Sequence, residues 1–237
     1  MARRLPLAGA VALALLLAAC APPEKPPPIV ERPADFPESV YLDAAKDPAN
    51  RVYRVDASAS LLQMKVFKAG PLARLGHDHV VAGRDLHGYL LVNPGKGACR
   101  GDLFVAVDRL TVDEPALRSA AGMNTELSTG DIEATRANML NHVLEVERFP
   151  FLQARLRGCD PAAGRFEVTL TAHGVSRVLE LRPADMRVDD TRVSVTAELT
   201  IRQTDFGMAP FTALGGLLQV ADEVSVSCAL AAHRLPP

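Results

Sequence analysis

The stretch TRVSVTAELTIRQT, residues 191–204, decides the fold of this chain. Apolar side chains stand at every second position from Val193 to Ile201, and polar or charged side chains fill the positions between them. Successive side chains on a β-strand point to opposite faces of a sheet, so this alternation predicts a strand with one apolar and one polar face.

The same alternation returns along most of the chain from Arg51 onward. It occurs in LLQMKVFKAG (61–70), LHGYLLVN (86–93), DLFVAVDRLTV (102–112), FLQARLRGC (151–159), GRFEVTLTAHG (164–174) and DEVSVSCALAAH (222–233). Seven or eight antiparallel strands of this kind would leave an apolar face in water if the sheet stayed flat. We therefore expect an all-β domain over residues 51–237 that closes into a barrel or folds into a sandwich.

One segment, STGDIEATRANMLNHVLEV at 128–146, departs from this pattern. Its apolar residues recur with helical spacing, at Ile132, Met139, Leu140 and Val143. Ser128 or Thr129 can cap the first turn, where the following acidic residues suit the positive end of the helix dipole. We expect one amphipathic helix that plugs or flanks the barrel and ends before Pro150.

The N-terminus has the form of an export signal. Residues 1–19 begin with two arginines, continue with an apolar stretch too short to span a membrane, and end in small residues. The segment LAAC at 17–20 resembles the lipobox of bacterial lipoproteins, which implies cleavage before Cys20 and acylation of that cysteine. The alternative is an ordinary signal peptide with an incidental cysteine. Ala21 is not the aspartate that often retains such proteins at the inner membrane, so we expect a periplasm-facing lipoprotein of the outer membrane.

Residues 20–50 and the overall composition set further limits. This segment holds eight of the 18 prolines, which predicts a semi-extended linker with little packed structure before Tyr41. The whole chain has 26 basic and 28 acidic residues and an isoelectric point near 6.3. Because no basic run is present either, we expect no nucleic-acid partner; the lipid on Cys20 would make the membrane a partner.

Three cysteines remain once Cys20 is assigned to the lipid. An oxidising compartment favours one disulfide and one free thiol. Cys99 opens the strand before the helix and Cys159 closes the strand after it, so antiparallel pairing of these strands would bring the two sulfurs together. Cys228 would then lie on the apolar face of the last strand. The competing pair is Cys159 with Cys228.

Several segments in order resemble the YceI-like family. They are YRVDASASLLQMKVFKAG (53–70), MLNHVLEVERFPFLQARL (139–156), VTLTAHGVSRVLELRP (168–183), LTIRQTDFGMAPF (199–211) and VADEVSVSCALAA (220–232). The resemblance covers residues 51–233. It implies an extended, eight-stranded, lipocalin-like antiparallel barrel with a hydrophobic cavity for a polyisoprenoid or fatty-acyl ligand.

The predicted inward side chains are mostly small or medium in size, which would leave a cavity in such a barrel. We expect its wall to consist of Val105, Val107, Leu152, Ala154, Leu156, Val168, Leu170, Ala172, Val195, Ala197, Leu199 and Val226. The alternative is a core filled completely by larger side chains and the helix. We predict no cofactor other than such a bound lipid.

The segment LGHDHVV at 75–81 carries two histidines that would share one face of a strand. We expect His77 and His79, together with Arg177, at the cavity mouth, where they would meet a ligand head-group. The alternative is a metal site on His77 and His79. Such a site needs a third ligand, for which the candidates are His87, His142, His173, Asp205 and Asp222.

Catalytic signatures are absent from the sequence. It has no Gly-x-Ser-x-Gly elbow, no His-Glu-x-x-His and no phosphate-binding glycine loop. Cys228 stands on an apolar face, where a reactive thiolate is disfavoured. We therefore expect a binding protein without enzymatic activity.

Overall fold

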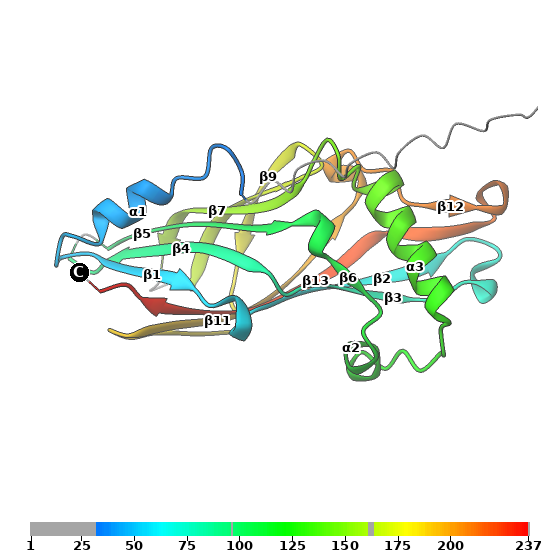
Figure 1. The fold of residues 1–237 in the computed structure, drawn as a ribbon, viewed down its shortest axis with the longest axis horizontal. Coiled ribbons are helices and arrows are strands. Elements are labelled where there is room, and N and C mark those ends of the chain that lie inside the picture. Colours follow the sequence, from blue (N-terminus) through cyan, green and yellow to red (C-terminus); the bar gives the residue numbers. More distant parts are fainter. Residues whose placement is uncertain (1–31, 96, 161–163, 237) are drawn as a thin grey trace, which may run out of the picture.

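A computed structural model describes residues 32–95, 97–160 and 164–236 (Figure 1). Its strands are β1 (Arg51–Val55), β2 (Leu61–Ala69), β3 (His79–Gly83), β4 (Leu86–Asn93), β5 (Ala98–Ala106), β6 (Thr111–Val112), β7 (Phe151–Asp160), β8 (Arg165–Ala172), β9 (Val175–Leu181), β10 (Asp185–Val188), β11 (Arg192–Arg202), β12 (Thr212–Ala213) and β13 (Leu218–Arg234). The helices are α1 (Glu38–Ala44), α2 (Pro115–Ala120) and α3 (Thr129–Asn138). Short helical turns are η1 (Ala57–Ala59), η2 (Ala73–Leu75), η3 (Val107–Arg109), η4 (Met139–Val143, a π-helix), η5 (Thr204–Phe206) and η6 (Leu214–Gly216).

All strands belong to one antiparallel sheet, and β13 organises it. The main path runs β6-β3-β2-β13-β1-β4-β5-β7-β8-β9. Strand β13 is long enough to pair with β2 and β1 along one edge and with β11 and β12 along the other. A bulge between Val220 and Val224 bends it, and Gln203 holds this bulge with two hydrogen bonds.

The sheet curls along the long axis of the molecule, but its hydrogen bonds do not close a ring. Strands β9 and β10 follow one another in the chain, and they form no ladder with each other in the described ranges. Pro183, which stands between them, has no amide N–H to donate.

The antiparallel sheet is therefore as expected, whereas the closed eight-stranded barrel is not confirmed: the sheet has 13 strands in the described residues, and its hydrogen bonds do not close a ring. The strand count exceeds eight partly because some expected strands are interrupted. The expected strand at 102–112, for example, is broken by η3 into β5 and β6.

The expected helix is present as α3 and its π-helical continuation η4. Ser128 and Asp131 form a reciprocal capping box at its start. Ile132, Met139 and Leu140 pack against the main core of the sheet, so the helix flanks the curled sheet (Figure 1).

The N-terminal segment differs from the expected linker. Helix α1 packs on the outside of the sheet, and Tyr41 is completely buried there. Its hydroxyl donates to Oδ2 of Asp102 at 2.5 Å, and its ring stacks on Tyr89. A buried carboxylate needs such donors, and Arg100 and Arg157 supply the others. The proline content of residues 20–50 gave no sign of this buried tyrosine.

The signal at residues 1–19 and the lipidation site Cys20 lie outside the described residues. Within the described ranges, no helix is long and apolar enough to cross a bilayer.

Candidate functional site

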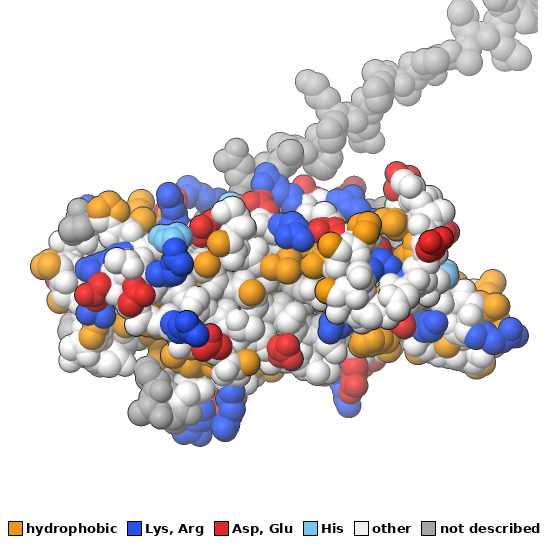
Figure 2. Space-filling view, turned by 90° about the horizontal axis from the view of Figure 1, so that it is seen from below, with side chains coloured by type: hydrophobic (Ala, Val, Ile, Leu, Met, Phe, Trp, Pro, Cys, Tyr) orange, Lys and Arg blue, Asp and Glu red, His pale blue; other side chains and the backbone are white. Residues whose placement is uncertain are grey.

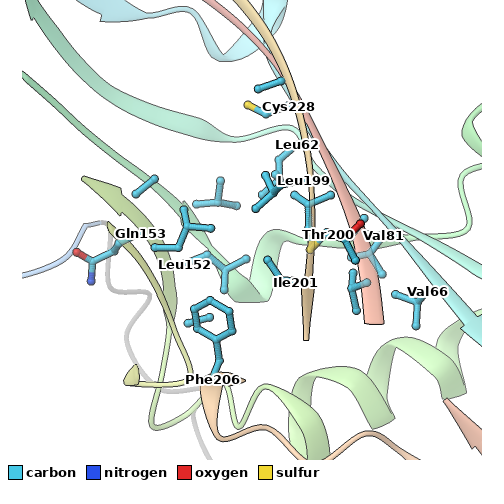
Figure 3. A pocket seen from close by; sticks show the side chains of 18 of the residues that line it. Leu62, Val66, Val81, Leu152, Gln153, Leu199, Thr200, Ile201, Phe206 and Cys228 are labelled. Atoms are coloured by element: carbon cyan, nitrogen blue, oxygen red, sulfur yellow. The ribbon is translucent and has the colours of Figure 1, made fainter. Parts of the chain in front are cut away.

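The curled sheet encloses a cavity of about 1000 Å³. Alternate residues of β2, β5, β7, β8, β11 and β13 form its wall, because alternation turns one face of each strand inward. Figure 3 shows Leu62, Leu152, Leu199, Ile201 and Phe206 converging on this space. The volume lies near the top of the range of roughly 300–1,000 Å³ that small-molecule sites occupy.

Eleven of the twelve side chains expected in the wall line this cavity. They are Val105, Leu152, Ala154, Leu156, Val168, Leu170, Ala172, Val195, Ala197, Leu199 and Val226. The exception is Val107, which is buried in the main core instead. Strand β5 ends at Ala106, and the Val107 amide donates to the carbonyl of Pro150, so the alternation stops one residue too early for Val107 to face inward.

Other elements contribute wall residues that the sequence analysis did not include. Strand β2 adds Leu62, Met64 and Val66, whose alternation in the sequence was a sufficient signal. The helical insert adds Met139 and Val143. Helical spacing shows that these two side chains share a face, but it does not show where that face docks.

His77 and His79 both line the cavity, His77 from the loop before β3 and His79 as the first residue of that strand. The Nδ1 atom of His79 lies 2.6 Å from Oδ2 of Asp113, whose side chain is completely buried. Asp113 also accepts from Nη1 of Arg118 at 2.7 Å and from the amide of Val80 at 3.0 Å.

These contacts fix the charge of Asp113 and the position of the proton on Nδ1 of His79. Burial acts to raise the pKa of Asp113, but hydrogen bonds from His79, Arg118 and Val80 outweigh it, and the pKa lies below its usual value. An ionised carboxylate only accepts hydrogen bonds, so Nδ1 of His79 carries the proton. The ring is thereby held in one orientation at the cavity wall.

The alternative metal site is not assembled. In the part of the chain that the structure describes, no group of three His, Cys, Asp or Glu side chains could hold a metal ion. Asp113 occupies one nitrogen of His79, and three of the other candidate ligands have partners elsewhere: His173 bonds to Glu145, His87 pairs with Asp85, and Asp222 accepts from Thr204.

The polar end of the cavity also differs from expectation at Arg177. This residue lies exposed on β9, where it donates to the carbonyl of Ser176, and it is not part of the cavity wall. Lys68 lines the polar end instead, and its Nζ donates to the carbonyl of Gly76 at 3.2 Å. Asp131 of α3 also lines this end, where Ser128 hydrogen bonds and nearby His77 lower its pKa.

Cys99 and Cys159 form a disulfide between β5 and β7, with their Cα atoms 5.9 Å apart. The pairing chosen from the strand order is therefore supported. Cys228 is a free thiol that lines the cavity, and burial raises its pKa to about 11. It is therefore almost entirely protonated at neutral pH, which disfavours nucleophilic chemistry.

Comparisons with known proteins agree with this architecture. The model of the YceI-like domain matches residues 92–232. BcnA from Burkholderia cenocepacia has 14% sequence identity and a TM-score of 0.54, and the match covers 75% of this chain and 98% of BcnA. A polyisoprenoid binding domain from Saccharophagus degradans has 16% identity and a TM-score of 0.53, with 77% and 98% covered. At these identities the likeness shows the fold alone. No curated protein matches the chain. The chain belongs to the YceI-like family.

Proposed function

We propose that this protein is a periplasm-facing lipoprotein that binds or carries a long apolar molecule, of polyisoprenoid or fatty-acyl type, in its cavity. The observation that carries the proposal is the cavity of about 1000 Å³ with its wall of aliphatic side chains. Such a wall favours an apolar chain because burial of apolar surface is the main source of affinity in a site of this kind. The Saccharophagus degradans domain, which is a polyisoprenoid binding domain, supports the same ligand class.

The polar end of the cavity suits the ligand's head-group. Lys68, His77 and His79 line it from β2 and the segment before β3. Asp113 orients His79, so the free Nε2 of the ring can accept a hydrogen bond, or donate one when the ring is protonated. The eleven inward residues named above would contact the chain, and these three the head-group.

We propose a binding role without catalysis. His79 and Asp113 resemble an oriented base, but in the described ranges no serine or cysteine side chain hydrogen-bonds to His77 or His79. The outer-membrane anchor through Cys20 is part of the same proposal and rests on the sequence of residues 1–21. The inner membrane is the less favoured location.

Native mass spectrometry of the protein purified from its host, followed by organic extraction, tests the proposal. We expect extra mass on the folded protein that extraction releases as an isoprenoid or acyl lipid. The extracted protein should then bind a fluorescent long-chain fatty acid. The proposal is overturned if no lipid co-purifies and the protein binds no long-chain probe.

A further inference from the structure

Two turns lie side by side at one end of the molecule, and we call them together the leucine tip. They are residues 70–76, between β2 and β3, and residues 213–218, which run from the last residue of β12 to the first residue of β13. The amide of Leu72 donates to the carbonyl of Leu217 at 2.9 Å, which joins the turns. They form the right-hand end of Figure 1, where the orange turn lies above the cyan turn.

The leucine tip exposes three large apolar side chains to water. Leu75 is 54% exposed, Leu214 is 60% exposed and Leu217 is 48% exposed. Leu214 has a φ of +53°, and Gly215 and Gly216, which follow it, also have positive φ values. A bulky side chain in this left-handed region is strained, and such strain gathers at functional sites. Neither burial nor hydrogen bonding in the described chain accounts for the outward position of these leucines.

The two turns themselves carry basic residues and no acidic ones, whereas Asp78 and Asp131 lie beside His77. Residues 67–77 and 206–221 contain Lys68, Arg74 and His77 but no aspartate or glutamate, although the chain as a whole is slightly acidic. Arg74 is exposed beside Leu75. Figure 2 shows hydrophobic and basic side chains gathered at this end of the face in view. An apolar surface with basic residues around it complements a bilayer whose surface carries anionic phospholipids.

The leucine tip is also continuous with the cavity. Leu75 and Gly76 from the first turn and Ala213 and Leu218 from the second line the cavity wall. Leu75 is thus both a wall residue and one of the exposed leucines. A long apolar chain could pass between a membrane and the cavity along this surface without contact with water.

We propose that the leucine tip docks on an anionic bilayer surface, with its three leucines at the acyl boundary and Arg74 at the phosphates. Docking would place the mouth of the cavity against the lipid, where the apolar ligand enters or leaves. The passage of ligand rests on the proposed function, whereas docking itself does not.

Vesicle flotation tests docking. A chain of residues 21–237 retains every described element and lacks Cys20, so no acyl anchor contributes. We expect it to float with vesicles of phosphatidylethanolamine and phosphatidylglycerol at 7:3. The tip variant L214N/L217S, which leaves the cavity-wall residue Leu75 unchanged, should lose at least tenfold in the partition coefficient; asparagine at 214 tolerates the left-handed backbone. R74E should also weaken binding. The control V40S/L42S/V178S removes exposed apolar side chains elsewhere and should float like the wild type.

Equal flotation of the tip variant and the wild type would overturn docking, as would wild-type flotation equally strong on pure phosphatidylcholine vesicles. A dimer detected by light scattering that the tip variant loses, without vesicle binding, would show that the leucines cover a second copy instead. Binding of a fluorescent long-chain fatty acid in solution, without vesicles, keeps the two proposals apart. The tip variant should retain this fatty-acid binding. If the wild type itself binds no fatty acid, that result contradicts the proposed function but not docking.

Discussion

Oδ2 of Asp113 lies 2.6 Å from Nδ1 of His79, and Oδ1 of the same carboxylate lies 2.7 Å from the guanidinium of Arg118. Asp113 thus links His79 in the cavity wall to Arg118 of α2, which lies 39 residues later in the chain. Arg118 is itself buried, and it also donates to the carbonyls of Asp78 and Thr125. The polar end of the cavity therefore depends on one buried carboxylate.

Replacement of Asp113 by asparagine should lower the free energy of unfolding by about 3–5 kcal/mol, because it leaves the buried Arg118 charge without its counter-ion. Urea unfolding followed by far-UV circular dichroism measures the change. The control is D85N, since Asp85 forms partly exposed pairs with His87 and Arg109 that are worth about 0–1 kcal/mol. Equal stabilities for D113N and the wild type would show that the buried pair contributes nothing.

Acid should destabilise the protein through the same carboxylate. The pKa of Asp113 is lower in the folded protein than its ordinary value of 3.8, so below about pH 5 the native state binds fewer protons than the unfolded state. The stability from Asp113 is complete above the unfolded pKa and is lost as the pH falls through the folded pKa. Asp102 should contribute in the same way. Burial acts to raise its pKa, but hydrogen bonds from Arg157, Tyr41 and Arg100 outweigh that effect, so its pKa also lies below the ordinary value.

The measurement is the urea midpoint at pH 7, 5, 4 and 3. We expect the wild type to lose stability progressively below about pH 5 and D113N to lose less over the same interval, because asparagine does not titrate. Parallel curves for the two proteins would contradict the assignment of this acid sensitivity to Asp113.

Filling the cavity should abolish ligand binding and leave the fold intact. Ala197 lies in the middle of β11 with its side chain in the wall, so A197F places a ring in the space that an acyl chain would occupy. We expect at least a tenfold loss of affinity for a fluorescent long-chain fatty acid. E198F is the matched control, because the next side chain along the strand points outward and is exposed. Equal loss in both variants would indicate damage to the sheet, not occupation of the cavity.

Reduction of the disulfide should destabilise the domain by roughly 3–4 kcal/mol, because Cys99 and Cys159 close a loop of 60 residues in the unfolded chain. The comparison is the urea unfolding of the wild type with that of C99S/C159S, with C228S as the control for loss of a thiol. If C228S loses as much stability as the double variant, the bridge is not the source.

Alternation alone predicted most of the cavity wall, since a side chain's face on a strand depends only on its parity. It also predicted that His77 and His79 face the same space, and both line the cavity, although His77 lies in the loop before β3, where strand parity does not apply. It failed at Val107, where a helical turn ends the strand, and parity has no meaning beyond a strand's end. The strand order also selected the Cys99–Cys159 pair, because antiparallel neighbours bring the start of one strand beside the end of the other.

The parts that sequence did not reveal depend on tertiary contacts. Asp113 reaches His79 through a turn in which Asp113 has a φ of +56°, and no pattern in the sequence joins the two. Tyr41 binds the outside of the sheet from within a proline-rich segment, where composition favours an extended chain. The opening in the sheet likewise lies at the turn around Pro183, across which β9 and β10 form no ladder with each other within the described ranges.

Cys228 can report on the cavity because its thiol lines the wall and has a pKa of about 11. Relative to its ordinary pKa of 9.0, this shift reduces the thiolate fraction at neutral pH roughly a hundredfold. We expect iodoacetamide to modify native Cys228 at least that much more slowly than Cys228 in unfolded protein with its disulfide intact, and the rate to rise up to about pH 11. A saturating long-chain fatty acid should slow the reaction further, because the acyl chain would lie against the sulfur.

Mass spectrometry of the modified protein gives the rates of modification, and C228S supplies the blank. Rapid modification at pH 7, or a rate that the fatty acid does not change, would contradict a buried thiol in the ligand's path.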